Sequence, residues 1–203
     1  MPWRSVAPGA IIVGMTAEAA FPESPVLSCG PGLLLRRHLE SDLAGLVEMC
    51  QDTEMRRWTT IPVPYGPREA EGFLAQVREG WSRGAVAALA IDLGGRFAGN
   101  IDLRLEEGSW AEVGYATAPW ARGRGAMTRG LEAALEWGFT VLGLEGVHWR
   151  AHVGNEASRR VAEKCGFRME GSARGLVLQR GRRFDGWLGS ILPTELIRSR
   201  LAE

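Results

Sequence analysis

The spacing of apolar residues in the first part of the chain predicts a strand followed by two helices. The run Leu33–Leu39 predicts the strand, and Ser41 is placed to cap the helix after it. The proline-broken stretch "RRWTTIPVPYGP" predicts a loop, and a second helix is predicted from Pro67 to just before Gly84. Each helix has one apolar stripe, formed by Leu43, Leu46, Val47 and Cys50 in the first and by Phe73, Leu74, Val77 and Trp81 in the second.

An antiparallel meander is predicted next, because three strand-like runs follow one another with hairpin-like turns between them: Val86–Leu93, Phe97–Leu105 and Trp110–Ala116. From Gly125 the apolar period becomes that of a helix, and an alternating strand, "GVHWRAHV", follows. A strand–helix–strand crossover of this length joins parallel neighbours. We therefore expect the strands that begin near Trp110 and Val147 to lie side by side and parallel.

The last part of the chain predicts a compact helix, a hairpin and a short terminal helix. "NEASRRVAEKCGF" has Asn155 as N-cap and Gly166 as the helix stop, the hairpin turns at Gly181, and the final helix follows Pro193. The order β-α-α-β-β-β-α-β-α-β-β predicts the α/β class, with a mixed, mostly antiparallel sheet and helices on its faces. No repeat or linker divides the chain, so we predict a flexible tail over residues 1–32 and a single domain over residues 33–203.

Composition narrows the classes of function. The 24 lysines and arginines balance the 24 aspartates and glutamates, so net charge supplies no reason to expect nucleic acid or an anionic membrane as a partner. The three cysteines, Cys29, Cys50 and Cys165, are odd in number and lack metal-ligand spacing, which fits a reducing cytoplasm. With three histidines in the chain, no metal site is expected. The apolar part of the tail is broken by Pro8, Gly9 and Gly14, so neither an export signal nor a membrane span is expected.

The turn before the central helix carries the main chemical signal. In Arg122–Gly125, backbone N–H groups and the positive end of the helix dipole together make a phosphate site, although a plain tight turn with solvated arginines has the same spacing. A Walker A loop needs lysine and then serine or threonine where Ala126 and Met127 stand. The dinucleotide fingerprint needs a third glycine where Thr128 stands. The turn matches neither nucleotide-binding motif.

Two motifs, one on each side of the fifth strand of the main sheet, resemble those of the GCN5-related N-acetyltransferase (GNAT) family. Arg122–Met127 is similar to its R/Q-x-x-G-x-G/A loop, and "NEASRRVAEKCGF" to its N-x-x-S-x-x-x-x-x-K-x-G-F helix. The resemblance covers residues 33–192, and "EVGYATAPWARGRGAMTRG" and "RGRRFDGWLGSILP" are most similar to the RimJ/RimL-like branch. It implies the GNAT fold, with parallel fourth and fifth strands splayed for coenzyme A. It also implies transfer of an acyl group, most often acetyl, from acyl-CoA to a primary amine by direct attack.

The resemblance also assigns the contacts to acyl-CoA, the expected cosubstrate. Main-chain N–H groups, with help from the arginines and a threonine hydroxyl, are expected to bind the pyrophosphate at Arg122, Gly123, Arg124, Gly125, Ala126, Met127 and Thr128. Met127 replaces the preferred glycine or alanine, and we expect its side chain to enter the core beneath the loop. Main-chain groups at the end of the fourth strand are expected to bind the pantetheine arm like an added strand: Tyr115, Ala116 and Thr117. Asn155 is expected to cap its helix and to bond the same arm.

Two catalytic positions depart from the common family pattern. Many members protonate the departing thiolate with a tyrosine, but Ala162 stands there, and Ser158 matches the serine that RimL-like enzymes offer. An ordinary helix serine is the alternative interpretation of Ser158. Some relatives place a glutamate in the fifth strand where this chain has Arg150. Glu112 is then our leading candidate for the general base, since its apolar neighbours favour a raised pKa, although it also fits a solvent-facing strand residue.

The alternatives to Glu112 as base are Asp102, Asp185 and His152. A site without a base, which only positions a neutral amine, is a further alternative. Trp58 and Tyr65 lie in the predicted loop that flanks the acceptor side in this fold, where they would shape a pocket or pack on the helices.

The resemblance leaves the acceptor amine open. A protein N-terminal amino group is the leading acceptor, and a small amine or aminoglycoside-like molecule is the second. A CoA-binding module without catalysis is the alternative from another class. The implied partners are thus the CoA thioester, an amine acceptor and possible second copies of the chain, since homodimers are common for this fold.

Overall fold

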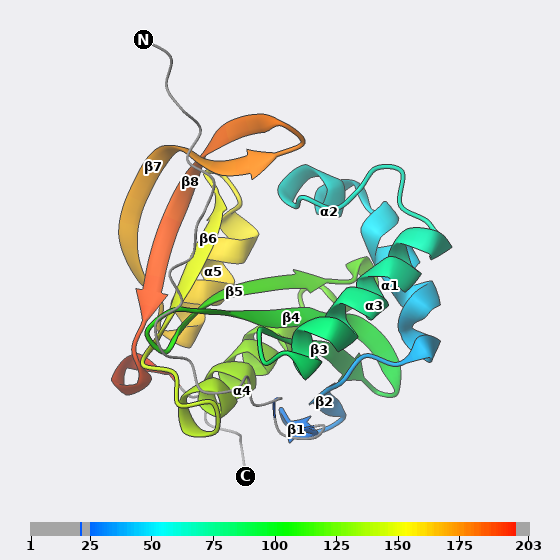
Figure 1. Cartoon of the computed structure of the whole chain (residues 1–203), viewed down its shortest axis with the longest axis horizontal. Helices are drawn as coiled ribbons and strands as arrows, with labels where there is room; N and C mark the ends of the chain where they lie inside the picture. The colour runs from blue at the N-terminus through cyan, green and yellow to red at the C-terminus, as the bar shows by residue number, and fades with distance from the viewer. Residues whose placement is uncertain (1–20, 22–24, 198–203) are drawn as a thin grey trace.

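The computed structural model describes residue 21 and residues 25–197, in which an eight-stranded mixed sheet forms the centre of the molecule (Figure 1). The strands lie in the order β1-β2-β3-β4-β5-β6-β8-β7. Neighbouring strands of this sheet are antiparallel except β5 and β6, which confirms the predicted parallel pair. The strands are β1 (Leu27–Ser28), β2 (Leu33–Arg36), β3 (Val86–Leu93), β4 (Arg96–Glu106), β5 (Trp110–Thr117), β6 (Gly146–His152), β7 (Arg168–Gln179) and β8 (Arg182–Ile191).

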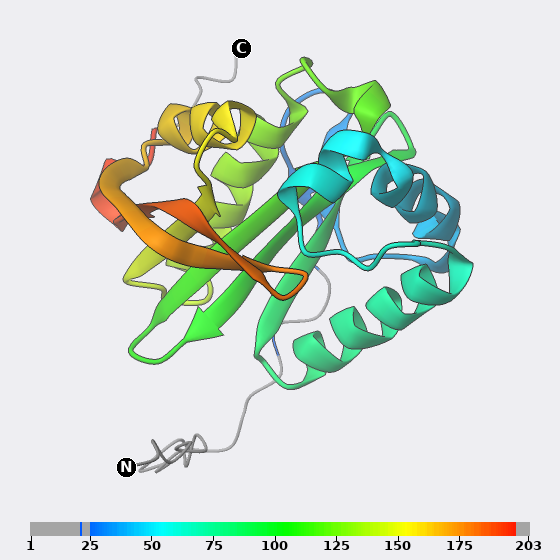
Figure 2. The same ribbon diagram turned by 90° about the horizontal axis from the view of Figure 1, so that it is seen from above.

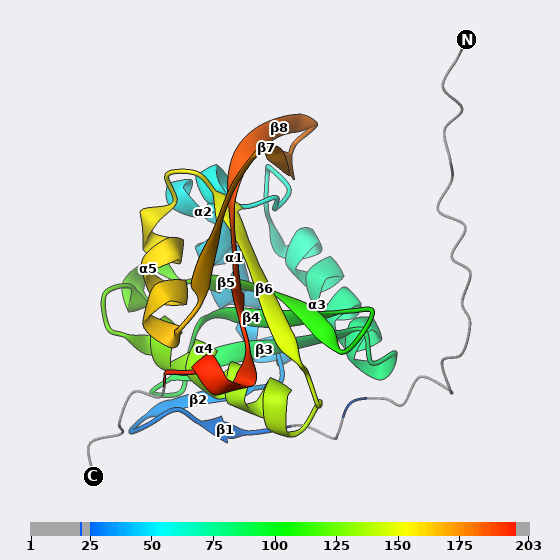
Figure 3. The same ribbon diagram turned by 90° about the vertical axis from the view of Figure 1, so that its left-hand side faces the viewer.

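Helices cover both faces of the sheet, as Figures 2 and 3 show from two sides. Helices α4 (Ala126–Thr140) and α5 (Glu156–Cys165) pack on one face, and α1 (Leu43–Gln51) and α3 (Pro67–Ser82) pack on the other. Helix α2 (Thr53–Trp58) extends from α1 toward the β7–β8 hairpin (Figure 1). Three short 3₁₀ turns complete the elements, over Glu40–Asp42 (η1), Pro119–Ala121 (η2) and Pro193–Glu195 (η3). In the described part of the chain, no helix is long and apolar enough to cross a membrane.

Two apolar clusters hold these layers together. The larger lies between the sheet and helices α4 and α5 and includes Leu35, Ile101, Leu135 and Trp149. The smaller lies beneath α1 and α3 and includes Leu46, Leu74, Phe97 and Ala90. Side chains alternate between the faces of a strand, so β5 presents Ala111 and Val113 to the larger cluster and Glu112 and Gly114 to the opposite, α1–α3 face.

The predicted loop after the first helix is wrong at its start. Arg56, Arg57 and Trp58 form the last turn of α2. This short helix is stabilised by Asp52, whose Oδ1 accepts a hydrogen bond from the Met55 N–H at 3.1 Å. The three residues therefore hold defined positions beside the site.

The prediction of Ser41 as N-cap is also wrong. Ser41 lies inside η1, and Asp42 occupies the N-cap position of α1. Strand β2 ends at Arg36 instead of continuing to Leu39, because the Leu39 N–H bonds Asp42 Oδ2 at 2.9 Å rather than a neighbouring strand.

The sheet also includes residues that fall within the predicted tail. Leu27 and Ser28 pair with β2, and Phe21 and Cys29 are buried in the larger cluster. The rest of the predicted tail, residues 1–20 and 22–24, lies outside the described residues, as do residues 198–203.

Candidate active site

Strands β5 and β6 part in the middle of the sheet. Their pairing runs from Trp110 opposite Gly146 to Val113 opposite Trp149. Beyond that point β5 stays paired with β4 as far as Thr117, while β6 stays paired with β8 as far as His152. The main chain of residues 114–117 therefore has no β6 partner, and its groups on that side are free to bond an extended ligand.

The turn that follows β5 has an open backbone. Gly123 and Gly125 have φ angles of +75° and +72°, in the left-handed region that glycine adopts without strain. A Cβ atom built on either glycine would have no heavy atom within 4 Å. Both glycines are exposed, so no side chain in the described part of the chain covers this backbone, and it is accessible to a ligand.

The turn ends at the N-terminus of the 15-residue helix α4, where the conditions suit an anion. Gly125 is the N-cap and supplies no side-chain cap, and the first turn of α4 carries no acidic residue. The unpaired N–H groups and the positive end of the helix dipole are thus directed at the exposed turn. The residues present fit a diphosphate group at this position.

The two arginines of the turn differ in their surroundings. Arg122 is ion-paired with Asp52 at the start of α2. Burial would raise the pKa of Asp52, but the Arg122 guanidinium and the Met55 N–H outweigh it and hold that pKa below its ordinary value. Arg124 instead lies 5.9 Å from the ring centroid of Trp120 and remains exposed, which leaves its charge available to a phosphate.

Met127 is buried in the larger cluster, with 6% of its surface exposed. The side chain therefore packs beneath the turn, as expected, and Ala126 is buried beside it, so residues 122–125 are the exposed part of the loop. Thr128 is half-buried, and its carbonyl oxygen accepts a hydrogen bond from Cys165 Sγ at 3.5 Å, which links α4 to α5.

A hydrogen-bond network spans the point where the strands part. Trp149 Nε1 donates to Ser158 Oγ at 3.0 Å, and Ser158 Oγ donates to the Tyr115 hydroxyl at 3.1 Å. The Tyr115 hydroxyl in turn donates to the Ser158 carbonyl at 2.7 Å. Burial raises the pKa of Tyr115, which keeps the phenol protonated as a donor. Asn155 Oδ1 accepts from the Ser158 N–H at 3.2 Å, so the predicted N-cap is confirmed.

On the α1–α3 face, charged side chains of alternating sign form a row across β4, β5 and β6. Arg104 is ion-paired with Asp102 on its own strand and with Glu112 on β5, the latter at 2.7 Å. Arg150 on β6 is ion-paired with the other oxygen of Glu112. Glu112 thus lies between two guanidinium groups with 15% of its side chain exposed, and both of its oxygens are engaged.

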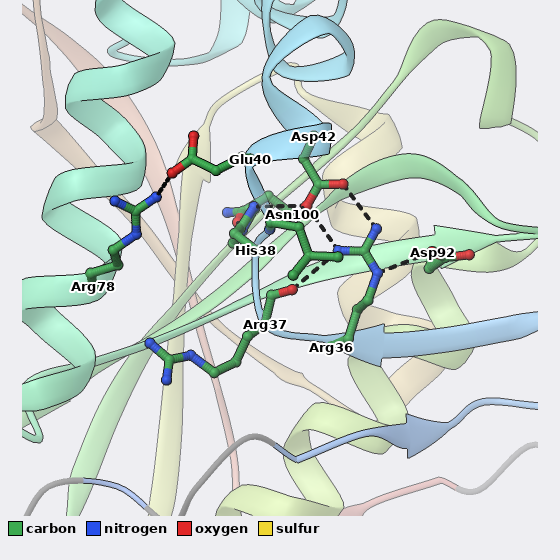
Figure 4. Close-up of polar contacts among 9 residues, drawn as sticks. Arg36, Arg37, His38, Glu40, Asp42, Arg78, Asp92 and Asn100 are labelled. Carbon is green, nitrogen blue, oxygen red and sulfur yellow. Dashed lines mark hydrogen bonds and ion pairs between the residues drawn. The ribbon is translucent and has the colours of Figure 1, made fainter.

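The row continues from Asp102 to two neutral side chains. Asn100 Nδ2 donates to Asp102 Oδ1 at 3.1 Å, and Asn100 Oδ1 lies 2.7 Å from His38 Nε2 (Figure 4). Because the Asn100 oxygen is an acceptor, this arrangement assigns the hydrogen to Nε2 of the imidazole. Burial lowers the pKa of His38, which favours the neutral ring. A neutral donor chain therefore holds one oxygen of Asp102.

The β7–β8 hairpin and α2 border this face on one side. Gln179, at the end of β7, is buried and donates to the carbonyl oxygens of Arg57 and Thr59 at 3.0 and 2.6 Å. Next to this contact, His152 lies 6.0 Å from Trp58 and 5.2 Å from Phe184 between ring centroids. These three rings, from α2, β6 and β8, border the α1–α3 face at the end of β6.

Two of the sequence candidates are used elsewhere. Tyr65 is buried in the smaller cluster, which fits the alternative of packing on the helices. Asp185 Oδ1 accepts from the Gly175 N–H at 3.0 Å and orients the β7–β8 hairpin. Among the described residues, no three histidine, cysteine or acidic side chains are grouped as a metal site would require.

Sequence reasoning missed several residues that shape the site. Asp52, Asn100 and Gln179 act through contacts between elements far apart in the chain. Of these, Asp52 carried a usable signal in the sequence. An aspartate at the N-cap with a glutamate, here Glu54, in the first turn is typical of a helix start.

A splayed strand pair beside an uncapped helix N-terminus is the arrangement expected of a coenzyme A-dependent acyltransferase. The chain belongs to the Acetyltransferase (GNAT) domain family, whose pattern matches residues 32–168. Members of this family transfer an acyl group from acyl-CoA to an amine, and acetyl-CoA is the cosubstrate expected here.

Individual relatives agree with the family. The chain is 30% identical over 162 residues to the Bacillus subtilis protein "Putative ribosomal N-acetyltransferase YdaF". The aligned region covers 76% of this chain and 87% of YdaF. Mycobacterium smegmatis RimJ, solved with CoA-disulfide, has a TM-score of 0.75 at 22% identity, covering 87% of this chain and 90% of RimJ. An acetyltransferase from Salmonella typhimurium that modifies the N-terminal serine of ribosomal protein L7/L12 has a TM-score of 0.74 at 20% identity. The match covers 83% of this chain and 99% of the Salmonella protein. The structural similarity to these two shows the shared fold.

Proposed function

We propose that this chain acetylates the α-amino group of a protein N-terminus, with a ribosomal protein as the leading acceptor. One observation carries the proposal: β5 and β6 part at Val113 and Trp149, beside the charged row of the α1–α3 face. A thioester bound along residues 114–117 would therefore meet an amine that approaches from this face. The similarity to YdaF and to the Salmonella enzyme supports a ribosomal acceptor.

The residues of the turn and of β5 would hold the cosubstrate. The exposed backbone of Gly123–Gly125 at the N-terminus of α4 suits the pyrophosphate, and Arg124, for which no ion pair is seen among the described residues, supplies a positive charge beside it. The main chain of Tyr115, Ala116 and Thr117 suits the pantetheine arm. When bound, acetyl-CoA supplies an acetyl group activated as a thioester.

Ser158 is our proposed hydrogen-bond donor to the departing sulfur. Its hydroxyl lies where the strands part, where it accepts from Trp149 Nε1 and donates to the Tyr115 oxygen. For this role its one hydrogen would turn from the Tyr115 oxygen to the sulfur. Glu112, the leading base from the sequence, stays a candidate, but a proton taken by its carboxylate would disrupt an ion pair with Arg104 or Arg150. Neither oxygen of Glu112 is free of an ion pair, which weighs against its role as the base.

A binding titration followed by an acceptor screen tests the function. Calorimetry with CoA, acetyl-CoA, propionyl-CoA and succinyl-CoA is expected to show binding, with acetyl-CoA preferred. Release of free thiol is then measured with peptides that begin with a free serine, with the same peptides blocked at the N-terminus, and with small amines such as spermidine and an aminoglycoside.

Each outcome of the screen separates one alternative. Turnover with free peptides alone supports the proposal, and turnover with small amines alone supports the small-molecule alternative. CoA binding without thiol release from any acceptor supports a non-catalytic CoA-binding module. Absence of binding to every CoA species contradicts the proposal as a whole.

We also propose a cytoplasmic location, which the three free, buried cysteines support. A homodimer is a further prediction from the family resemblance, and sedimentation of the purified protein tests it.

A further inference from the structure

We propose that Asp102 is the catalytic base that takes a proton from the acceptor ammonium. In this step an N–H bond of the ammonium breaks and an O–H bond forms on the Asp102 carboxylate, which leaves a neutral amine and a neutral carboxyl group. The carboxyl group then returns its proton to water. The inference rests on the proposed acyl transfer and names a further residue for it.

The first support is the position of Asp102 over the parting of the strands. Asp102 pairs across β4 and β5 with Gly114, the first β5 residue beyond the last β5–β6 pair. A Cβ atom on Gly114 would lie 3.1 Å from Asp102 Oδ1 and 2.7 Å from Arg104 Nη1. The carboxylate thus lies directly over the Gly114 backbone, in space that the missing side chain leaves free. An acetyl group held by the main chain at this point would lie next to it.

The second support is the set of partners that the two Asp102 oxygens have. Oδ2 is ion-paired with Arg104, whereas Oδ1 accepts from the neutral Asn100 amide. A proton can therefore be taken on Oδ1 at the expense of one neutral hydrogen bond. Both oxygens of Glu112, in contrast, are paired with guanidinium groups. Asp102 ends the charged row on the side where its neighbours are neutral.

The third support is the electrostatic environment. Asp102 is faced by Asn100 and Arg104 from β4, by Gly114 and Glu112 from β5, and by Ala88 from β3. Burial raises the pKa of Asp102 above its ordinary value and outweighs the opposing effects of Arg104 and Asn100. A carboxylate with a raised pKa is a stronger proton acceptor near neutral pH than an exposed one.

Asn100 and His38 are positioning residues in this arrangement. His38 Nε2 donates to the Asn100 oxygen (Figure 4). This bond fixes the Asn100 amide so that Nδ2 donates to Asp102 Oδ1. With 1% of its side chain exposed, His38 has no access to an acceptor and acts only through Asn100.

The pH dependence of kcat/KM in Asp102→Asn tests the proposal, with acetyl-CoA and a serine-initiated peptide as substrates. In the wild type, kcat/KM is expected to fall only as the pH drops through the Asp102 pKa. In Asp102→Asn there is no base, so the reaction uses only the amine that is already neutral. The fall of kcat/KM at low pH (the acid limb of the profile) therefore moves up to the amine pKa of about 7.7–8.0. At pH 6 the variant is then expected to be roughly 100-fold slower, because about one amine in a hundred is neutral there. Above about pH 8.5 the two profiles converge.

The matched control is Glu106→Gln on the same strand, an exposed side chain paired with His148, and its profile is expected to match the wild type. Folding and CoA binding of Asp102→Asn are checked by thermal unfolding and calorimetry.

A drop in kcat/KM of equal size at every pH in Asp102→Asn overturns the proposal, and so does a pH profile of Asp102→Asn that matches the wild type. A shifted limb in Glu112→Gln with an unchanged limb in Asp102→Asn assigns the base to Glu112. If the wild type releases no thiol at any pH, the proposed function fails instead.

Discussion

Tyr115 and Ser158 are joined by two hydrogen bonds that run in opposite directions. The phenol donates to the Ser158 carbonyl at 2.7 Å, and the Ser158 hydroxyl donates back to the phenol oxygen at 3.1 Å. Trp149 on β6 donates to the same hydroxyl. The serine therefore connects β5, β6 and α5 where the two strands part, so its removal is expected to affect both stability and catalysis.

We predict that Ser158→Ala lowers kcat by about 10²-fold with little change in the KM for acetyl-CoA, because a donor to the departing sulfur acts in the transition state. The loss of the hydroxyl also leaves Trp149 Nε1 unpaired, which is expected to lower the free energy of unfolding by about 1–3 kcal/mol. Steady-state kinetics and urea unfolding measure the two effects.

Tyr115→Phe is the comparison for Ser158→Ala. It removes the phenol oxygen from the same network but keeps the serine hydroxyl. It is expected to cost similar stability and to retain more of kcat. An equal loss of kcat in both variants contradicts a donor role for Ser158 and assigns it to positioning.

We predict that Gly123→Ala weakens CoA binding by roughly 5–10-fold, equivalent to about 1–1.4 kcal/mol. Its φ of +75° disfavours any residue with a Cβ, and the added methyl group would project from the exposed turn. Calorimetric titration with CoA measures the change. Gly95→Ala in the β3–β4 turn is the matched control, since its φ is +81° and a Cβ there also meets nothing within 4 Å. Both variants are expected to lose similar stability, and equal loss of CoA affinity would contradict a specific role for Gly123.

The elements with strong local signals were predictable from the sequence, and the contacts between distant elements were not. Met127 illustrates the first kind, because the period of the helix placed it on the apolar side, where it is buried. His38 and Asn100 illustrate the second kind, because their contact depends on where β2 ends relative to β4, 62 residues away. The predicted loop hid α2 because two nearby prolines dominated the local pattern, although Asp52 supplied a helix cap. The turn was therefore found from sequence, whereas the charged row was not.

We predict that Gly114→Ala lowers kcat strongly while CoA binding changes little. Its Cβ would lie 2.7 Å from Arg104 Nη1 and 3.1 Å from Asp102 Oδ1, so both charged groups must shift away from the backbone. Misplacement of a reacting group by about 1 Å costs about 10²-fold in rate. Gly72→Ala in α3, where a Cβ meets nothing within 4 Å, serves as control and is expected to leave kcat unchanged. A normal kcat in Gly114→Ala would show that Asp102 and Arg104 need not lie over this residue.

We predict that Asp52→Asn strengthens CoA binding by about 2–5-fold at low ionic strength and that the gain disappears in high salt. The substitution removes the negative charge that is paired with Arg122, and asparagine remains a good N-cap for α2. Titration of the variant with CoA at several salt concentrations measures the effect. Glu79→Gln, an equal charge change at an exposed position of α3, is expected to have no effect. An unchanged affinity in Asp52→Asn would indicate that Arg122 does not contact the phosphates.

The buried pair of Arg36 and Asp42 predicts part of the acid sensitivity of the fold. Each Asp42 oxygen accepts from Arg36 at 2.8 Å, and Oδ2 also accepts from the Leu39 N–H (Figure 4). Burial alone would raise the pKa of Asp42, but the Arg36 and Leu39 hydrogen bonds outweigh it and hold that pKa below its ordinary value. The pair therefore contributes its full stability above the unfolded pKa of about 3.9, and this contribution is lost as the pH falls through the lower folded pKa.

We predict that Asp42→Asn lowers the free energy of unfolding by about 1–3 kcal/mol at pH 7, because Arg36 loses one of its two carboxylate partners and keeps the ion pair with Asp92. The difference between variant and wild type is expected to stay constant from pH 7 to about pH 5 and to narrow below about pH 4, as Asp42 of the wild type becomes protonated. Urea unfolding at a series of pH values measures it. Glu40→Gln breaks an exposed ion pair with Arg78 nearby and is expected to cost no more than about 1 kcal/mol at any pH. A gap between Asp42→Asn and the wild type that persists undiminished at pH 2 would contradict the assignment, because the protonated carboxyl can no longer pair with Arg36.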